Sequence, residues 1–218
     1  MRRLTRFAAV AVAALLLTGC LPLSLAPLYT GPGDLVFDEA LLGTWVPPAE
    51  EGKDLSVWGT WTIERDEHDT PRYRIRVAGT VDEKTFTTTF VAHLVKVGDG
   101  LFLDLFPVAQ EPDPGIGPWM ALHLATCHSF MPIKIDGKDG FTLQPVDLDK
   151  LAKKLKAQPD LVAHHFAQDD DGDDAALIFT ADSKALQAFV RDHLTADLLS
   201  DAQPFRRAEA KPVTPPTR

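Results

Sequence analysis

The residues best suited to chemistry are one cysteine–histidine pair. Cys127 and His128 are adjacent, and a thiol beside an imidazole can form an activated nucleophile. Neighbouring residues on a strand point to opposite faces, so adjacency in sequence opposes contact between these two side chains. We therefore expect Cys127 to be a buried, inert thiol, and we assign no catalytic residue and no enzyme activity to the chain.

Two groups of side chains suggest metal binding. His93, His123 and His128 lie on or beside expected strands, and three imidazoles can hold zinc with one open position. No two of them have the i, i+2 spacing that one face of a strand supplies. The acidic run at 169–174 lacks the alternating acids and distal Glu of a calcium loop. We expect no metal and no cofactor, and we interpret the run as a solvated hairpin tip.

One acidic residue stands within a strongly apolar stretch. Asp104 has Phe102 and Phe106 on its own strand face, and its direct neighbours are Leu103 and Leu105. A carboxylate in these surroundings must be paired, hydrogen-bonded or protonated. Two interpretations stay open: a structural partner such as an Arg or a backbone amide, or a ligand-binding contact inside a cavity.

The elements that would position these residues are mostly strands. Residues 56–146 show two-residue periodicity interrupted by turns, most clearly where Tyr73, Ile75 and Val77 alternate with arginines. Evenly spaced short strands predict an antiparallel meander that forms a barrel or a sandwich. Further along, the pattern predicts two helices, one over 148–157 and one that starts near Asp182 or Ser183. The predicted fold class is therefore mainly β (α+β), with two helices in the C-terminal half.

The composition limits the classes of partner. The chain has 218 residues, 31 acidic and 22 basic, and its formal net charge is −9. An acidic protein is poorly suited to bind nucleic acid or the charged surface of an anionic membrane. A length of this order predicts a single domain, which we place at 34–203. Four prolines after residue 203 predict a disordered tail over 204–218.

The N-terminus has the pattern of a secretory signal. Three arginines precede an apolar run, Phe7 to Leu17, that is too short to span a bilayer as a helix. The run ends in Leu17-Thr18-Gly19-Cys20, which resembles the lipobox of bacterial lipoproteins. The resemblance implies that residues 1–19 are a signal peptide and that Cys20 is the lipidation site. Three prolines between 20 and 33 then indicate a lipid-anchored tether.

Two further resemblances concern the body of the chain. Gly43-Thr44-Trp45, just before the strands, resembles the first-strand motif of lipocalins, in which the Trp lies at one end of an eight-stranded barrel. The stretch from Gly43 to Leu194 is similar to a group of uncharacterised bacterial lipoproteins, for example in its strand-to-helix junction at 177–189. That group implies no activity.

These observations favour a membrane-anchored cell-envelope lipoprotein without enzyme activity. Its β domain is expected to bind a small apolar or amphipathic ligand, because the strands carry many aromatic residues. The alternative is an interaction module for another envelope protein, without a ligand cavity. Leu21 follows the cysteine where an Asp would favour the inner membrane, so in a Gram-negative host we expect the outer membrane.

Overall fold

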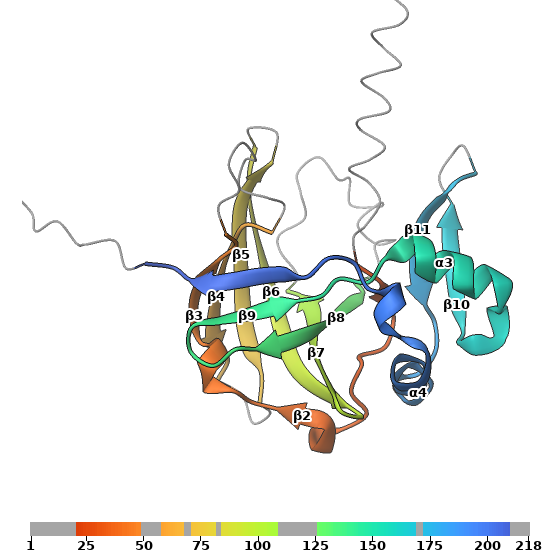
Figure 1. Cartoon of the computed structure of the whole chain (residues 1–218), viewed down its shortest axis with the longest axis horizontal. Coiled ribbons are helices and arrows are strands. Elements are labelled where there is room, and N and C mark those ends of the chain that lie inside the picture. The colour runs from red at the N-terminus through yellow and green to blue at the C-terminus, as the bar shows by residue number, and fades with distance from the viewer. Residues whose placement is uncertain are drawn as a thin grey trace, which may run out of the picture.

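The computed structural model describes residues 21–48, 58–67, 71–81, 84–108, 126–168 and 172–209, and every structural statement below concerns these residues. They form a closed, mostly antiparallel barrel with a smaller layer against one side (Figure 1). That layer contains both α-helices and a two-stranded hairpin.

Eight strands close the barrel, each antiparallel to both of its neighbours. Around the ring the order is β3-β4-β5-β6-β7-β8-β9-β12, and β12 pairs again with β3. Their bounds are β3 (Gly43–Val46), β4 (Thr60–Arg65), β5 (Tyr73–Val81), β6 (Lys84–Val97), β7 (Gly100–Pro107), β8 (His128–Ile135), β9 (Gly140–Leu143) and β12 (Gln203–Arg207). The predicted mainly β fold is confirmed, and of the two architectures left open the barrel is the one that forms.

Side chains alternate along the barrel wall, so the wall separates two hydrophobic cores. The inner core is made of Leu41, Trp45, Trp61, Ile63, Tyr73, Ile75, Val77, Ala92, Leu94, Leu103, Leu105, Met131, Ile133, Phe141, Leu143 and Phe205. The outer core is made of Leu28, Val95, Val97, Phe102, Phe130, Val146, Leu151, Leu155, Val162, Leu177, Phe179, Ala181, Leu186, Phe189, Val190 and Leu198. On β6, for example, Leu94 belongs to the inner core and Val95 to the outer one.

The smaller layer outside the barrel contains the two predicted helices, and both are confirmed. The side chain of Asp147 accepts a hydrogen bond from the Lys150 amide at 3.0 Å, and that of Asp182 accepts one from the Ala185 amide at 2.8 Å. Aspartate caps of this kind satisfy the free amides of a first helical turn. The elements of this layer are α3 (Leu148–Ala157), η3 (Pro159–Leu161), β10 (His164–Gln168), β11 (Asp174–Phe179), α4 (Ser183–His193) and η4 (Ala196–Leu198), where η marks a 3-10 helix.

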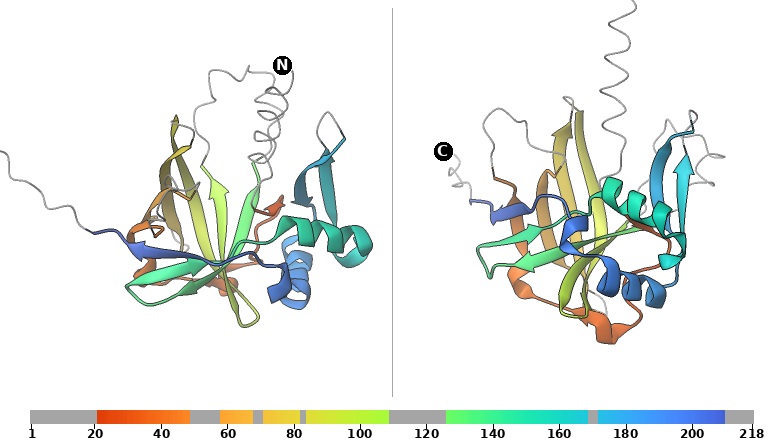
Figure 2. Two further views of the ribbon diagram at one scale, coloured as in Figure 1. Left: turned by 45° about the horizontal axis from the view of Figure 1, so that its top comes forward. Right: turned by 45° about the vertical axis from the view of Figure 1, so that its right-hand side comes forward.

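The N-terminal segment is packed on the barrel, so the predicted tether over 20–33 is wrong where the structure describes it. β1 (Leu23–Ser24) pairs with β8 on one side and with β11 on the other (Figure 2). Leu28 is fully buried in the outer core. Prolines are compatible with an extended chain, and here that chain gains burial and hydrogen bonds from distant strands. It continues as η1 (Pro32–Asp34), β2 (Leu35–Val36) and η2 (Glu39–Leu41).

The C-terminal boundary also needs a correction. The predicted tail over 204–218 begins inside β12, which completes the barrel between β3 and β9. Phe205 is only 3% exposed and stacks on Phe141, with ring centroids 4.8 Å apart. Pro204 is tolerated in the strand although it has no amide to donate. Residues 210–218 lie outside the described part of the chain.

Candidate functional site

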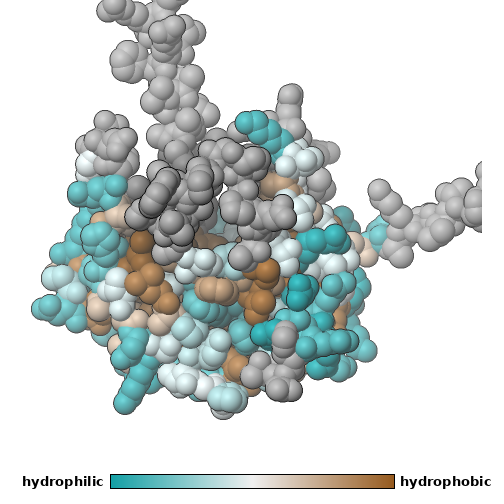
Figure 3. All heavy atoms as spheres, turned by 180° about the vertical axis from the view of Figure 1, so that it is seen from behind, coloured by the Kyte–Doolittle hydropathy of each residue, from teal (hydrophilic) through white to brown (hydrophobic). Residues whose placement is uncertain are grey.

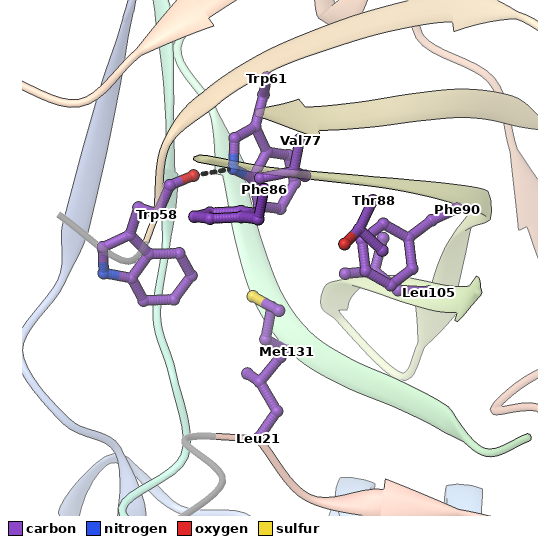
Figure 4. Close-up of a pocket in the computed structure, with 9 residues that line it drawn as sticks. All are labelled: Leu21, Trp58, Trp61, Val77, Phe86, Thr88, Phe90, Leu105 and Met131. Carbon is purple, nitrogen blue, oxygen red and sulfur yellow. Dashed lines mark hydrogen bonds between the residues drawn. The ribbon is translucent and has the colours of Figure 1, made fainter. Parts of the chain in front are cut away.

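An apolar pocket of about 180 Å³ lies on the inner side of the barrel wall (Figure 4). Neighbouring strands contribute side chains that face the same space, and the N-terminal segment and the turn before β4 contribute one each. The lining residues are Leu21, Trp58, Trp61, Val77, Phe86, Thr88, Phe90, Leu105 and Met131. Eight of these nine side chains are hydrophobic, and Thr88 supplies a hydroxyl.

Strand periodicity explains why these residues share a space. Phe86, Thr88 and Phe90 are alternate residues of β6, so their side chains leave the strand on the same face. Thr88 pairs in register with Val77 of β5, and Val77 pairs with Trp61 of β4. Three adjacent strands therefore supply a continuous apolar lining.

Local features hold the aromatic rings at the edge of the pocket. The indole nitrogen of Trp61 donates a hydrogen bond to the Trp58 carbonyl at 2.6 Å, which fixes the turn before β4. Gly79 pairs with Phe86, and a Cβ at position 79 would lie 2.8 Å from the Phe86 ring. The missing side chain at Gly79 is what allows the Phe86 ring to lie there.

The pocket suits a small apolar group. Burial of apolar surface contributes about 25 cal/mol per Å² in free energy, so a hydrocarbon in this space would be held by desolvation. The volume of about 180 Å³ is smaller than the roughly 300–1,000 Å³ of sites that enclose a drug-sized ligand. The space therefore fits a short apolar molecule, or one end of a longer chain.

Asp104, the acidic residue singled out in the sequence, lies on the opposite side of the wall from the pocket. It is fully buried, and its Oδ2 accepts a hydrogen bond from the Leu28 amide at 2.7 Å. Its Oδ1 lies 2.7 Å from Nδ1 of His128. The expected structural partner, a backbone amide, is thus present. Ligand binding by Asp104 stays a prediction, and such a ligand would not share the space with the apolar pocket.

Other polar groups surround this carboxylate. His93 of β6 pairs in register with Asp104 and is 7% exposed. Its Nδ1 has no hydrogen-bond partner among the described residues. Burial lowers the pKa of His93, and this effect exceeds the opposing attraction of the Asp104 carboxylate. The Tyr29 ring lies 4.6 Å from the His93 ring, centroid to centroid. We call Tyr29, His93, Asp104 and His128 the Asp104 cluster; it connects the N-terminal segment to β6, β7 and β8.

Two of the three histidines considered as zinc ligands lie in the described part of the chain. His93 and His128 both lie in the Asp104 cluster, whereas His123 lies outside the described residues. In the described part of the chain, no group of three or more His, Cys, Asp or Glu side chains could hold a metal ion. The absence of a zinc site therefore stays a prediction for the complete chain.

The acidic run at 169–174 is also only partly placed. Gly172 adopts a φ of +83°, as expected at a tight turn between two strands, and the flanking strands β10 and β11 pair in antiparallel register. Asp174 forms an ion pair with Lys156 of α3. Residues 169–171 lie outside the described part of the chain, so the interpretation of the run as a solvated tip without calcium stays a prediction.

In the cysteine–histidine pair, the thiol that was expected to be buried is only partly buried, and the imidazole has a carboxylate partner. Nδ1 of His128 is engaged with Asp104, and the Phe106 ring lies 4.6 Å from the imidazole ring. Burial raises the pKa of the Cys127 thiol. A raised pKa reduces the thiolate fraction, and the thiolate is the reactive form.

The sequence analysis missed the part that the N-terminal segment plays in the pocket. Leu21 was assigned to a tether, yet it lines the apolar space. The two-residue pattern of this segment gave no signal, because Pro22 and Ser24 are buried while Leu25, in the alternation of leucines, is 53% exposed. The predicted lipidation site, Cys20, is the residue before the first described one, and its modification stays a prediction.

Comparisons with protein-family models, curated proteins and solved structures found no significant match. Within the described residues, neither α-helix has the length and apolar character needed to span a bilayer. The geometry therefore defines the protein as a closed eight-stranded antiparallel barrel with an apolar pocket.

Proposed function

We propose that the protein is a lipid-anchored envelope protein that binds one small apolar or amphipathic ligand in its barrel. The pocket of about 180 Å³ lined by eight hydrophobic side chains is the observation that carries this proposal. The closed eight-stranded barrel is consistent with the lipocalin-like fold suggested by Gly43-Thr44-Trp45, and Trp45 is fully buried in the inner core. The proposed role is binding without catalysis.

The anchor rests on the sequence. The basic residues, the apolar run and Leu17-Thr18-Gly19-Cys20 support cleavage before Cys20 and acylation of its thiol. Two or more acyl chains give stable membrane attachment, whereas one chain gives only marginal binding. Metabolic labelling with an alkyne fatty acid tests this step. We expect label on the wild-type protein and none on Cys20→Ala; an unlabelled wild-type protein would contradict the anchor.

Ligand binding can be tested on soluble protein that starts after the signal peptide and carries Cys20→Ala. N-phenyl-1-naphthylamine, whose fluorescence rises in apolar surroundings, is titrated into it. Thr88→Phe places a ring in the pocket, and we expect it to weaken probe binding at least tenfold. Thr85→Phe adds the same ring to an exposed position of the same strand and should leave binding unchanged.

Equal binding by both variants would place the probe elsewhere and contradict the proposed site. Absence of probe binding by the parent protein would leave the interaction module as the better account.

The surface gives the interaction module little support. Figure 3 shows hydrophobic patches among hydrophilic ones on one face. Among the described residues, however, only two large hydrophobic side chains are clearly exposed, Leu25 at 53% and Val36 at 36%. Single exposed hydrophobic residues are ordinary on soluble proteins.

A further inference from the structure

The first described residue of the chain is part of the pocket wall. Leu21 lines the pocket together with Met131 of β8, and the two side chains lie beside each other in Figure 4. Leu21 also packs against the inner core of the barrel. The described part of the chain therefore begins at the wall of the pocket.

The residues that follow hold Leu21 in this place. Pro22 is buried, and Leu23–Ser24 pair with strands on both sides. The Leu25 amide donates a hydrogen bond to the Phe179 carbonyl at 3.0 Å, and the Leu28 amide donates one to Asp104 at 2.7 Å. These contacts fix the path of the chain directly after Leu21.

This arrangement constrains any lipid attached to residue 20. Consecutive Cα atoms are about 3.8 Å apart, so a group on the Cys20 thiol begins within a few ångströms of Leu21. An anchor of two or more acyl chains would hold this side of the barrel against the bilayer. No flexible linker separates the barrel from the anchor, because β1 starts three residues after Cys20.

We infer that the pocket takes the end of one lipid acyl chain, which enters from the membrane side beside the anchor. This inference rests on the proposed function and specifies its ligand. The lining carries no charged side chain, and its polar groups are the Thr88 hydroxyl and the two indole N–H groups, so it suits methylene groups and not a charged head group. A volume of about 180 Å³ takes only part of a long chain, so the head group stays outside.

Two lipids could supply the acyl chain that enters the pocket. One is a neighbouring bilayer lipid, and the other is the lipid on Cys20 itself. Covalent attachment raises the effective concentration of the second without any new contact. The chemistry of the pocket, an acyl-chain end in an apolar space, is common to both, and the experiment separates them.

The experiment uses the full lipidated protein in vesicles of phosphatidylcholine brominated near the end of its acyl chains. Bromine quenches tryptophan at short range, and Trp58 and Trp61 line the pocket. Trp119, which lies outside the described residues, is replaced in all samples by Trp119→Phe. If a bilayer lipid fills the pocket, we expect brominated vesicles to reduce the tryptophan emission of the parent protein at least twofold. The reduction should be much smaller in Thr88→Phe and should equal that of the parent in Thr85→Phe.

A second measurement identifies the source of the chain. Lipidated protein and soluble Cys20→Ala are titrated with dodecanoate in detergent-free conditions. If the lipid on Cys20 fills the pocket, bromine will not quench, and the lipidated protein will bind dodecanoate at least tenfold more weakly than Cys20→Ala. This outcome supports the inference with the protein's own lipid as the source. Quenching by bromine supports it with a bilayer lipid as the source.

The inference fails if lipidated protein shows neither bromine quenching nor weakened dodecanoate binding while Cys20→Ala binds dodecanoate. In that case the pocket binds apolar ligands but does not open to the bilayer. Absence of dodecanoate binding by Cys20→Ala would instead contradict the proposed function. Circular dichroism and melting curves of all variants show whether a lost signal reflects unfolding.

Discussion

The two faces of the β6–β7–β8 wall differ in what they bury. On the inner face, Leu94, Leu105 and Met131 face other hydrocarbon side chains, and part of the space beside them stays open as the pocket. On the outer face, the same strands carry His93, Asp104 and His128, and these polar groups are covered by the N-terminal segment. The wall thus separates an apolar pocket from a polar cluster in which Asp104 accepts a hydrogen bond from the N-terminal segment.

The largest expected effect comes from the inner core. Phe205→Ala removes a ring that is 3% exposed and contacts Phe141 and Trp61 from the last strand of the barrel. We expect the free energy of unfolding to fall by about 3–5 kcal/mol, as for other buried phenylalanines. Urea denaturation measures it. Arg206→Ala, at the exposed neighbouring position, is the control; equal effects of the two changes would contradict the assignment of β12 to the barrel.

The outer face should respond to loss of its carboxylate. Asp104→Ala leaves the buried Leu28 amide without its acceptor and His128 without its partner. A buried donor left unsatisfied costs about 1–3 kcal/mol, and the partly buried His128 loses its partner as well, so we expect a loss of roughly 2–4 kcal/mol. Asp99→Ala, in an exposed turn, should change stability by less than about 0.5 kcal/mol.

The affinity of the Asp104→Ala variant for the apolar probe shows whether the outer face takes part in ligand binding. If Asp104 serves only to hold the N-terminal segment, Asp104→Ala should keep its affinity for the apolar probe under conditions in which it is folded. A loss of affinity as large as that of Thr88→Phe would show that Asp104 takes part in ligand binding. That result would favour the interpretation of Asp104 as a ligand contact over the purely structural one.

The smallest effect concerns pH. Burial lowers the pKa of His93 in the folded state, with Asp104, Arg72 and His128 as the charged or titratable neighbours that modify it. As pH falls through the unfolded pKa of about 6.5, the unfolded chain takes up a proton that folded His93 resists, so stability decreases. His93→Leu should reduce the loss of stability between about pH 7.5 and about pH 5.5 in urea titrations. An unchanged loss would show that His93 titrates normally.

The parts of the fold that were predictable are those that depend on local signals. The alternation from Tyr73 to Val77, the helix caps at Asp147 and Asp182 and the β10–β11 turn all lie within a few residues of the structure they specify. The described residues 21–33 and 204–209 were assigned wrongly to a tether and a tail because their structure depends on distant strands. β1 needs β8 and β11, and β12 needs β3 and β9.

The sequence allowed a prediction of the apolar nature of the candidate site but not of its position. The aromatic content indicated an apolar interior, and for Asp104 both a structural partner and a ligand contact were left open. The sequence did not indicate that Asp104 would face away from the barrel interior, since that depends on which face of β7 closes the barrel. Nor did it indicate where side chains leave a gap, because the pocket at Leu21, Trp58 and Phe86 results from packing between segments far apart in the chain.

The central claim is that the space beside Met131 binds apolar ligands, and methyl NMR tests it most directly. After residue 19 the chain has two methionines, Met120 and Met131, so selective methyl labelling of the Cys20→Ala protein that starts after residue 19 gives a simple spectrum. Titration with dodecanoate should shift the Met131 resonance in a saturable manner, and Thr88→Phe should abolish the shift. A Met131 resonance that stays unchanged while dodecanoate binds elsewhere, or does not bind, would contradict the account.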